Sequence, residues 1–380
     1  LVGTLFAGIL LFAGIGCSHF SGPQGWSGGV IVDDALVIGS MDGLLLSLNK
    51  NTGQETEEWK PLVFPRFSGG KGGILAGNPD SENEKKRAIY GSPVVHEGII
   101  YVASYDGVIT AVNLENGEIL DRLIIAEQLV GGVTFHDKKL FVGSSDGSMH
   151  ALEVLRDGKM TRLWEWPGKS SNYEATRPGI WSTPATHNGT VFFGSLDHKV
   201  YGLDSSTGEE IWAFTTNAAV AASPVVYGGT VFVGSFDKIF YALNAENGEE
   251  IWRFTGASNW YWGSAAVTEK YVLAPSLDGK LYALDRITGR PVWEFDTGSP
   301  IVGSPAIAKD NVVVASRDGD VYLLELDTGF ALDKCPIDEK IETPMTIDGD
   351  AVYFGARDHT IRSLRIDRAT LDEDLWPSPY

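Results

Sequence analysis

The chain is poor in cysteine and in positive charge, and both shortages limit what it can be. Cys17 and Cys335 are the only two cysteines in 380 residues, so a framework of disulfide bonds is excluded. Lys and Arg number 30 against 50 Asp and Glu, which gives a formal net charge of −20. Nucleic acids and anionic lipids bind clustered Lys and Arg, so we expect neither as a main partner.

Long apolar runs are also scarce, and the one at the N-terminus is short. Residues 1–16 are apolar and uncharged, a pattern typical of a secretory signal and short for a membrane span. Cys17 follows small and apolar residues and so resembles the lipid-modified cysteine of a bacterial lipobox, although Gly14 stands at the usual Leu position. We expect residues 1–16 to be a secretory or lipoprotein signal segment and Cys17 to be lipidated. The alternative is a plain signal peptide or an uncleaved anchor.

What the chain has in quantity is a repeat, most regular at residues 222–254. Three β-branched or aromatic runs and one short apolar run alternate there with three turns, at Tyr227-Gly228-Gly229, Phe236-Asp237-Lys238 and Glu246-Asn247-Gly248. Such short runs between turn residues predict four antiparallel strands and leave no room for a helix.

The second turn of this unit recurs with an Asp. It is found at Asp42, Asp106, Asp146, Asp197, Asp237, Asp278, Asp318 and Asp358, with separations of 64, 40, 51, 40, 41, 40 and 40 residues. A near-constant period with four strands per unit predicts an all-β, eight-bladed β-propeller. Residues 17–380 then form one domain, and the two longer separations predict insertions at about 60–89 and 168–180. The sequence leaves open whether the N-terminal segment adds a strand to the last blade.

Three blades share an eleven-residue run from a small residue to Trp, with Gly seventh: Gly202–Trp212, Ala242–Trp252 and Ala283–Trp293. This run resembles the tryptophan-docking motif of the pyrroloquinoline-quinone (PQQ) type of propeller, in which the Trp packs between blades. Other blades depart from it. Trp59, Trp164 and Trp376 are displaced along the sequence, and Asp121 and Asp333 stand at the Trp position.

Within that class, the length, the lipobox-like start and the eight repeats resemble the BamB-type outer-membrane assembly lipoproteins. The resemblance implies a non-enzymatic scaffold at a membrane surface, with partner-binding residues in loops between blades. The corresponding loops here are Tyr173–Ser182, which contains Arg177, and Thr215–Ala222, which lacks the acidic residues of the family. No partner-binding residue is therefore transferred from the family.

Catalytic and metal-binding patterns are weak. Ser145 lies in a G-x-S-x-G string, but in a predicted hairpin rather than a strand–turn–helix. The repeated Asp residues and the histidines of the first turns, His96, His136 and His187, are spread one per blade, so a shared metal is not expected. PQQ-dependent dehydrogenases share the fold, and many carry an adjacent Cys pair that is absent here. We therefore predict no cofactor and no enzymatic activity.

The strongest functional signal is an uneven set of aromatic residues where the first strands begin. That position holds Trp26, Tyr90, Val130, Trp181, Ala221, Trp262, Val302 and Ile341, with Trp260 and Tyr261 beside Trp262. The innermost strands line the central channel, so we expect these side chains at its mouth, together with Arg177, Asn217 and Asn259. They suit a sugar, a peptide or a strand of a partner protein. The alternative is that they only plug the channel.

These patterns, together with the resemblance to the BamB-type lipoproteins, predict an extracytoplasmic, lipid-anchored, monomeric propeller. It would lie at the periplasmic face of the outer membrane or at the cell surface, and bind a protein partner or a small ligand there. The alternatives from other classes are a quinoprotein dehydrogenase or carbohydrate-active propeller, and a ligand-sensing module of a signalling system.

Overall fold

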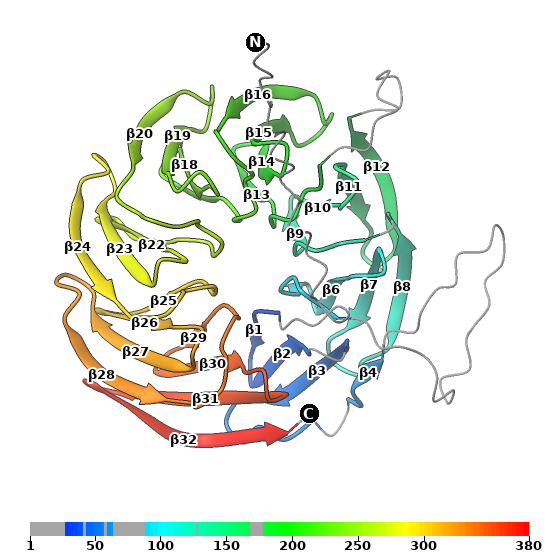
Figure 1. Cartoon of the computed structure of the whole chain (residues 1–380). Coiled ribbons are helices and arrows are strands. Elements are labelled where there is room, and N and C mark those ends of the chain that lie inside the picture. The colour runs from blue at the N-terminus through cyan, green and yellow to red at the C-terminus, as the bar shows by residue number, and fades with distance from the viewer. Residues whose placement is uncertain are drawn as a thin grey trace, which may run out of the picture.

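The computed structural model shows a ring of eight sheets, each of four antiparallel strands with consecutive order (Figure 1). It describes residues 27–40, 43–56, 59–63, 88–126, 128–167 and 178–379, with side chains up to residue 372. The predicted all-β, eight-bladed propeller is confirmed. The first strand of each blade lies nearest the centre and the fourth lies outside. No helix in these ranges is long and apolar enough to cross a membrane.

The first four blades follow the chain in order from the N-terminal side. Blade 1 contains β1 (Val30–Val32), β2 (Ala35–Gly39), β3 (Leu44–Asn49) and β4 (Leu62–Val63). Blade 2 contains β5 (Val94–His96), β6 (Ile99–Ser104), β7 (Val108–Asn113) and β8 (Ile119–Ile124). Blade 3 contains β9 (Thr134–His136), β10 (Lys139–Gly143), β11 (Met149–Val154) and β12 (Met160–Trp166). Blade 4 contains β13 (Ala185–His187), β14 (Thr190–Ser195), β15 (Lys199–Asp204) and β16 (Glu210–Thr215).

The remaining four blades complete the ring. Blade 5 contains β17 (Val225–Tyr227), β18 (Thr230–Gly234), β19 (Phe240–Asn244) and β20 (Glu250–Phe254). Blade 6 contains β21 (Ala266–Val267), β22 (Tyr271–Pro275), β23 (Lys280–Asp285) and β24 (Pro291–Asp296). Blade 7 contains β25 (Ala306–Ala308), β26 (Asn311–Ala315), β27 (Asp320–Glu325) and β28 (Ala331–Pro336). Blade 8 contains β29 (Thr346–Asp348), β30 (Ala351–Gly355), β31 (Thr360–Asp367) and β32 (Thr370–Pro379).

The core lies in the seams between blades. In β18 and β19 almost every side chain is buried, whichever face of the sheet it is on, because a neighbouring blade covers each face. One apolar cluster between blades 4 and 5 joins Phe192 and Trp212 to Val231, Tyr241 and Leu243. The outer strand β20 instead alternates, with Trp252 and Phe254 buried and Ile251 exposed. Continuous apolar runs in the middle strands therefore follow from burial on both faces.

Among the described side chains, five tryptophans dock on the next blade, and two of these lie outside the eleven-residue motif. The indole Nε1 donates to a backbone carbonyl across the seam from Trp212 to Ala245 at 3.0 Å and from Trp252 to Arg286 at 3.0 Å. Trp293 makes the same bond to Leu326 at 3.0 Å. Although displaced in sequence, Trp59 and Trp164 also make it, to Leu114 at 2.9 Å and Ser205 at 3.2 Å. Their displacement from the eleven-residue motif therefore does not prevent docking.

The seam between blades 8 and 1 closes the ring without a shared strand. Blade 8 is built entirely from residues 346–379 and blade 1 from residues 30–63, which settles what the sequence left open (Figure 1). The Gly29 N–H donates to Thr346 Oγ1 at 3.0 Å, and the Tyr353 hydroxyl donates to the Lys50 carbonyl at 3.1 Å. Lys50 Nζ also lies 2.7 Å from Asp348. Side-chain contacts and packing around Tyr353 therefore hold the ends of the ring together.

Candidate functional site

One face of the ring, here called the mouth face, carries the turn between the second and third strands of each blade and the loops from blade to blade. The residue before each turn Asp links the two, because its N–H donates to a carbonyl of the incoming loop. Phe236 bonds to Ala219 at 2.9 Å, and Arg317 bonds to Pro300 at 2.8 Å. The link recurs in blades 2 to 8, so one turn residue in each of these blades is held on the mouth face.

A second ring of positions lies where each loop enters its first strand. Tyr261 and Ile301 are fully buried, and their N–H groups donate to Ser235 at 3.3 Å and Ser276 at 3.2 Å. Ile341, 1% exposed, is the corresponding residue of blade 8. The prediction that Ile341 faces the mouth is therefore wrong by one residue, and Glu342 takes that place. The register error arose because blade 8 has Pro344 where blades 6 and 7 have Ser264 and Ser304.

Three of the predicted aromatic residues come together on the mouth face. The ring centroids of Trp181 and Trp262, two blades apart, are 6.2 Å from each other. Phe236, from the turn of the blade between them, stacks on Trp260 at 4.7 Å and on Trp262 at 5.5 Å. We call Trp181, Phe236, Trp260 and Trp262 the aromatic cluster. Side chains two blades apart can meet only near the axis of the ring, so the cluster lies beside the channel.

The cluster is open to solvent. Trp260 is 44% exposed and Trp262 is 39% exposed, while Trp181 and Phe236 are partly buried beneath them. Large aromatic side chains left exposed in contact with one another are unusual on a monomer surface and mark interaction sites. Phe236 was missed by the sequence analysis. The signal in the sequence was the residue before each turn Asp, which differs widely between blades, while the residue before it is Ser in every blade but the last.

Tyr261 does not belong to this surface. Its side chain is fully buried against Phe240 and Gly234, and its hydroxyl has no hydrogen-bond partner among the residues that the structure describes. Burial raises the pKa of Tyr261 well above its ordinary value, which keeps the phenol neutral. The prediction that Tyr261 contacts a ligand beside Trp262 is corrected, because the side chains of neighbouring residues in an extended segment point in opposite directions.

The remaining predicted site residues lie apart or are used locally. Asn217 is exposed and its N–H donates to Asp237 at 3.0 Å, while the Asn259 amide donates to the Leu277 carbonyl at 3.3 Å. Tyr90 packs edge-on against Tyr105 at 5.6 Å, in blade 2. Trp26 and Arg177, together with Cys17, lie outside the described residues.

The turn Asp residues have a structural role beneath the mouth. In blades 4, 5 and 6 each accepts a hydrogen bond from the tyrosine four residues later. The pairs are Tyr201–Asp197 at 2.6 Å, Tyr241–Asp237 at 2.7 Å and Tyr282–Asp278 at 2.9 Å. Burial and the bonded carboxylate raise the pKa of Tyr241 and Tyr282 above the ordinary value. These contacts fix the turns that present the mouth residues.

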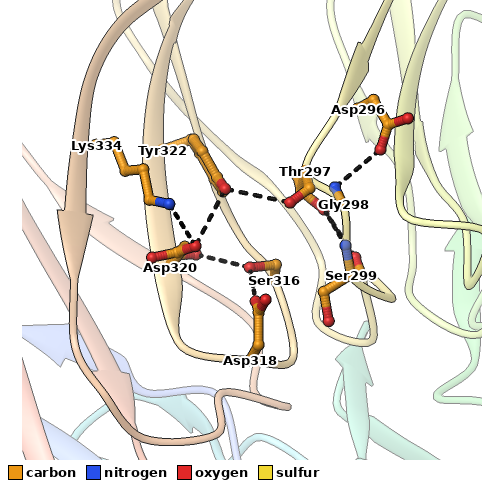
Figure 2. Close-up of polar contacts among 9 residues, drawn as sticks. All are labelled: Asp296, Thr297, Gly298, Ser299, Ser316, Asp318, Asp320, Tyr322 and Lys334. Carbon is orange, nitrogen blue, oxygen red and sulfur yellow. Dashed lines mark hydrogen bonds and ion pairs between the residues drawn. The ribbon is translucent and has the colours of Figure 1, made fainter.

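Blade 7 keeps the tyrosine but changes its partners (Figure 2). The Tyr322 hydroxyl lies 3.2 Å from the Thr297 carbonyl and 3.2 Å from Asp320, which is itself paired with Lys334 at 2.6 Å. The hydrogen bond to Asp320 raises the pKa of Lys334. The turn carboxylate, Asp318, is held by Ser316 Oγ at 2.5 Å instead. The residue between these two, Arg317, is presented on the mouth face.

The polar side of the mouth face is an ion-pair network across blades 7 and 8, which we call the arginine clasp: Arg317, Glu342 and Arg357. Glu342 Oε1 lies 2.7 Å from Arg317 Nε, and Glu342 Oε2 lies 2.6 Å from Arg357 Nη2. Arg357 Nε donates to the same oxygen at 2.8 Å. The two arginines stand at the turn position that holds Phe236 in blade 5, and Glu342 stands at the position of Trp262.

The described residues offer little for catalysis or metal binding. Ser145 lies in a hairpin turn, with its hydroxyl 3.3 Å from the Gln128 carbonyl, and not at the start of a helix. No group of three or more His, Cys, Asp or Glu within the described ranges could hold a metal. The geometry of the mouth face suits an apolar or aromatic group at the aromatic cluster and an anionic group at the arginine clasp.

Comparison with known proteins places the chain in a family. Residues 66–172, 158–259 and 237–332 match the family described as outer membrane protein assembly factor BamB, and the chain belongs to this family. The BamB of Nitrosomonas eutropha is 28% identical over 132 residues, 34% of this chain and 29% of that protein. The chain thus aligns with less than a third of the length of this relative.

Two other relatives bear on fold and activity. The crystal structure of BamB from Moraxella catarrhalis superposes with a TM-score of 0.68 over 90% of this chain and 96% of that one, at 14% identity, which shows a common fold. A 1-butanol dehydrogenase (cytochrome c) of Thauera butanivorans is 33% identical over 87 residues, 21% of this chain and 12% of the enzyme. The resemblance to PQQ-type propellers of the BamB kind is thereby confirmed.

Proposed function

We propose that this protein is a non-catalytic scaffold for the assembly of outer membrane proteins, and that it holds a segment of a protein partner on its aromatic cluster. The observation that carries the proposal is the contact of Trp181, Phe236, Trp260 and Trp262 across three blades, with two tryptophans more than a third exposed. Family membership supplies the process, because its members are described as assembly factors.

The face can be tested by complementation in the source bacterium. Without the gene, outer membrane proteins should become less abundant, and the intact gene should restore them. A Trp181→Ala/Trp262→Ala double variant should fail to restore them, because each interface aromatic contributes about 1–2 kcal/mol to binding. Phe330→Ala is the matched control, since Phe330 is 67% exposed in a turn between third and fourth strands, on the opposite face. Full restoration by the double variant would refute the proposed face.

We also propose that Cys17 carries a lipid anchor that keeps the propeller at a membrane of the cell envelope. Cys17→Ser should move the protein from the membrane fraction to the soluble fraction. Continued membrane retention, with an uncleaved N-terminus in the mass spectrum, would contradict the anchor without affecting the proposed binding face.

A quinoprotein dehydrogenase is the second candidate, favoured by the aligned stretch of the Thauera enzyme. The purified protein would be titrated with PQQ and Ca²⁺ and assayed for dye-linked oxidation of alcohols and sugars. We expect neither saturable binding nor turnover. A stoichiometric quinone complex would replace the scaffold proposal by an enzymatic one.

A further inference from the structure

The arginine clasp has more hydrogen-bond donors than Glu342 can use. A guanidinium carries five N–H donors, and a single carboxylate is shared here by two guanidiniums. The Arg317 side chain is 47% exposed. Its Nε forms an ion pair with Glu342 at 2.7 Å, and its guanidinium donates no hydrogen bond to any residue in the described part of the chain. Donors of Arg317 therefore remain available at the mouth.

The clasp is also held in place before any partner arrives. The N–H of Arg317 donates to the Pro300 carbonyl at 2.8 Å, and that of Arg357 donates to the Lys340 carbonyl at 3.0 Å. Asp318 is engaged by Ser316 and Asp358 by Arg362 at 2.7 Å, so neither turn carboxylate is left to occupy the free donors. A site that is already ordered loses little entropy when it binds.

We propose that the arginine clasp binds a carboxylate of an acidic peptide segment whose apolar residues lie on the aromatic cluster. This rests on the proposed function and adds the chemistry of the partner. The planar fork of Arg matches a carboxylate, and Glu342 already demonstrates that a carboxylate fits between the two guanidiniums. Both regions lie on the mouth face, with Val302 of blade 7 at the position between Trp262 and Glu342, so one extended segment can reach both.

Glu342 acts in this arrangement as an internal competitor for the partner's carboxylate. The incoming group must share the guanidiniums with Glu342 or displace it. Removing the charge of Glu342 should therefore strengthen binding. A purely structural clasp predicts no such gain.

The test uses two fluorescein-labelled Gly/Ser peptides that carry tryptophans, one with glutamates and one with glutamines at the same positions, titrated into the full chain by fluorescence anisotropy. The glutamate peptide should bind more tightly. Arg317→Gln/Arg357→Gln should weaken it roughly tenfold, the size expected for lost hydrogen bonds to charged groups, and leave the glutamine peptide unchanged. Glu342→Gln should tighten the glutamate peptide several-fold. Arg156→Gln/Arg290→Gln, at two exposed arginines in turns on the opposite face, removes the same two charges and should change the binding of neither peptide.

The outcomes separate this inference from the proposed function. Equal binding of both peptides, or no gain in affinity in Glu342→Gln, would overturn the clasp proposal alone. The variant Trp181→Ala/Trp262→Ala tests the aromatic cluster and should weaken the binding of both peptides. Competition by inorganic phosphate or by anionic phospholipid vesicles as strong as that by the glutamate peptide would also overturn it, since the site would then bind any anion. Circular dichroism and the melting temperature check folding, and Arg317→Lys should lose part of the preference while keeping the charge.

Discussion

The seam after blade 5 and the seam after blade 7 place different residues at the same position. Trp252 pairs with Ala242 within its sheet, and Asp333 pairs with Leu323 in the same register. Trp252 covers the next blade and bonds the Arg286 carbonyl at 3.0 Å, while Asp333 accepts the Leu371 N–H at 2.7 Å. In the seam between blades 2 and 3, Asp121 acts in the same way as Asp333 and accepts the Met160 N–H at 2.8 Å. Both seams contain an apolar cluster, but at this position the first gains further apolar area and the second gains a hydrogen bond to backbone.

The receiving turns of these two seams also differ. Under Trp252 lies Gly289 with φ of 69°, and a Cβ there would be 2.5 Å from the indole ring. The corresponding turn of blade 8 has no glycine, and Arg368 takes the positive φ of 56°. A flat indole needs a backbone without a side chain to lie on, so the glycine favours a docked Trp in the seam after blade 5. A glycine in the receiving turn does not by itself select a Trp, because Gly158 of blade 3 lies against Leu120 in the seam where Asp121 is the acceptor.

The largest effect should come from removing a docked indole. Trp252→Ala leaves a cavity between blades 5 and 6, so the free energy of unfolding should fall by about 3–5 kcal/mol. Denaturant unfolding followed by fluorescence measures it. A loss no larger than that of Asp333→Ala would mean that apolar area does not dominate this seam.

Asp333→Ala should have an intermediate effect. It leaves the Leu371 N–H without its acceptor in a partly buried seam, and such a group costs about 1–3 kcal/mol. Asp333→Asn keeps an oxygen acceptor and should recover most of the loss in the same unfolding experiment. If Asn is as damaging as Ala, the charge rather than the hydrogen bond is what the seam requires.

Asp237→Ala should cost about 1 kcal/mol of unfolding free energy, because it weakens a single turn at the edge of one blade. The lost contacts are those from Tyr241 at 2.7 Å and from the N–H groups of Asn217 and Ile239, both at 3.0 Å. The melting temperature should drop only slightly, and the drop should be smaller than for either seam variant. A larger drop would give the turns a greater share in stability than the seams.

The smallest effect should appear only on acidification and only in blade 3, where His150 replaces the tyrosine of blades 4 to 6. Burial lowers the pKa of His150 below its ordinary 6.5, despite the opposing attraction of Glu165 and Asp146. As the pH falls below 6.5, His150 becomes protonated in the unfolded chain but stays neutral in the folded one. The free energy of unfolding therefore decreases progressively as the pH falls below 6.5. Unfolding measured against pH should show this loss in the wild type and in His187→Gln, and less of it in His150→Gln.

Sequence reasoning found the repeat, the blade count and the face that carries the aromatic residues, because period and turn chemistry are local. It could not find that Trp59 and Trp164 dock. Both are displaced in the sequence because the turn before the fourth strand differs in length, and the sequence alone does not show that the Trp still reaches the next blade. It placed Ile341 at the mouth because the Ser/Thr-Pro marker shifts by one residue in blade 8. Phe236, Arg317 and Arg357 were readable as the variable residue before each turn Asp. Their contacts depend on residues from other blades, and no local pattern records those.

The way the ring closes has a consequence for how the chain folds. Sheet hydrogen bonds stay within each blade, so nearly all pairing joins residues close in sequence, and blades can form one after another as the chain emerges. The exception is the last seam, where Gly29 meets Thr346 across 317 positions. The entropy lost in closing a loop grows only with the logarithm of its length, and earlier blades already hold the ends near each other. Ring closure should therefore be the late step, and blades 1 and 8 should be the first to part when the protein unfolds.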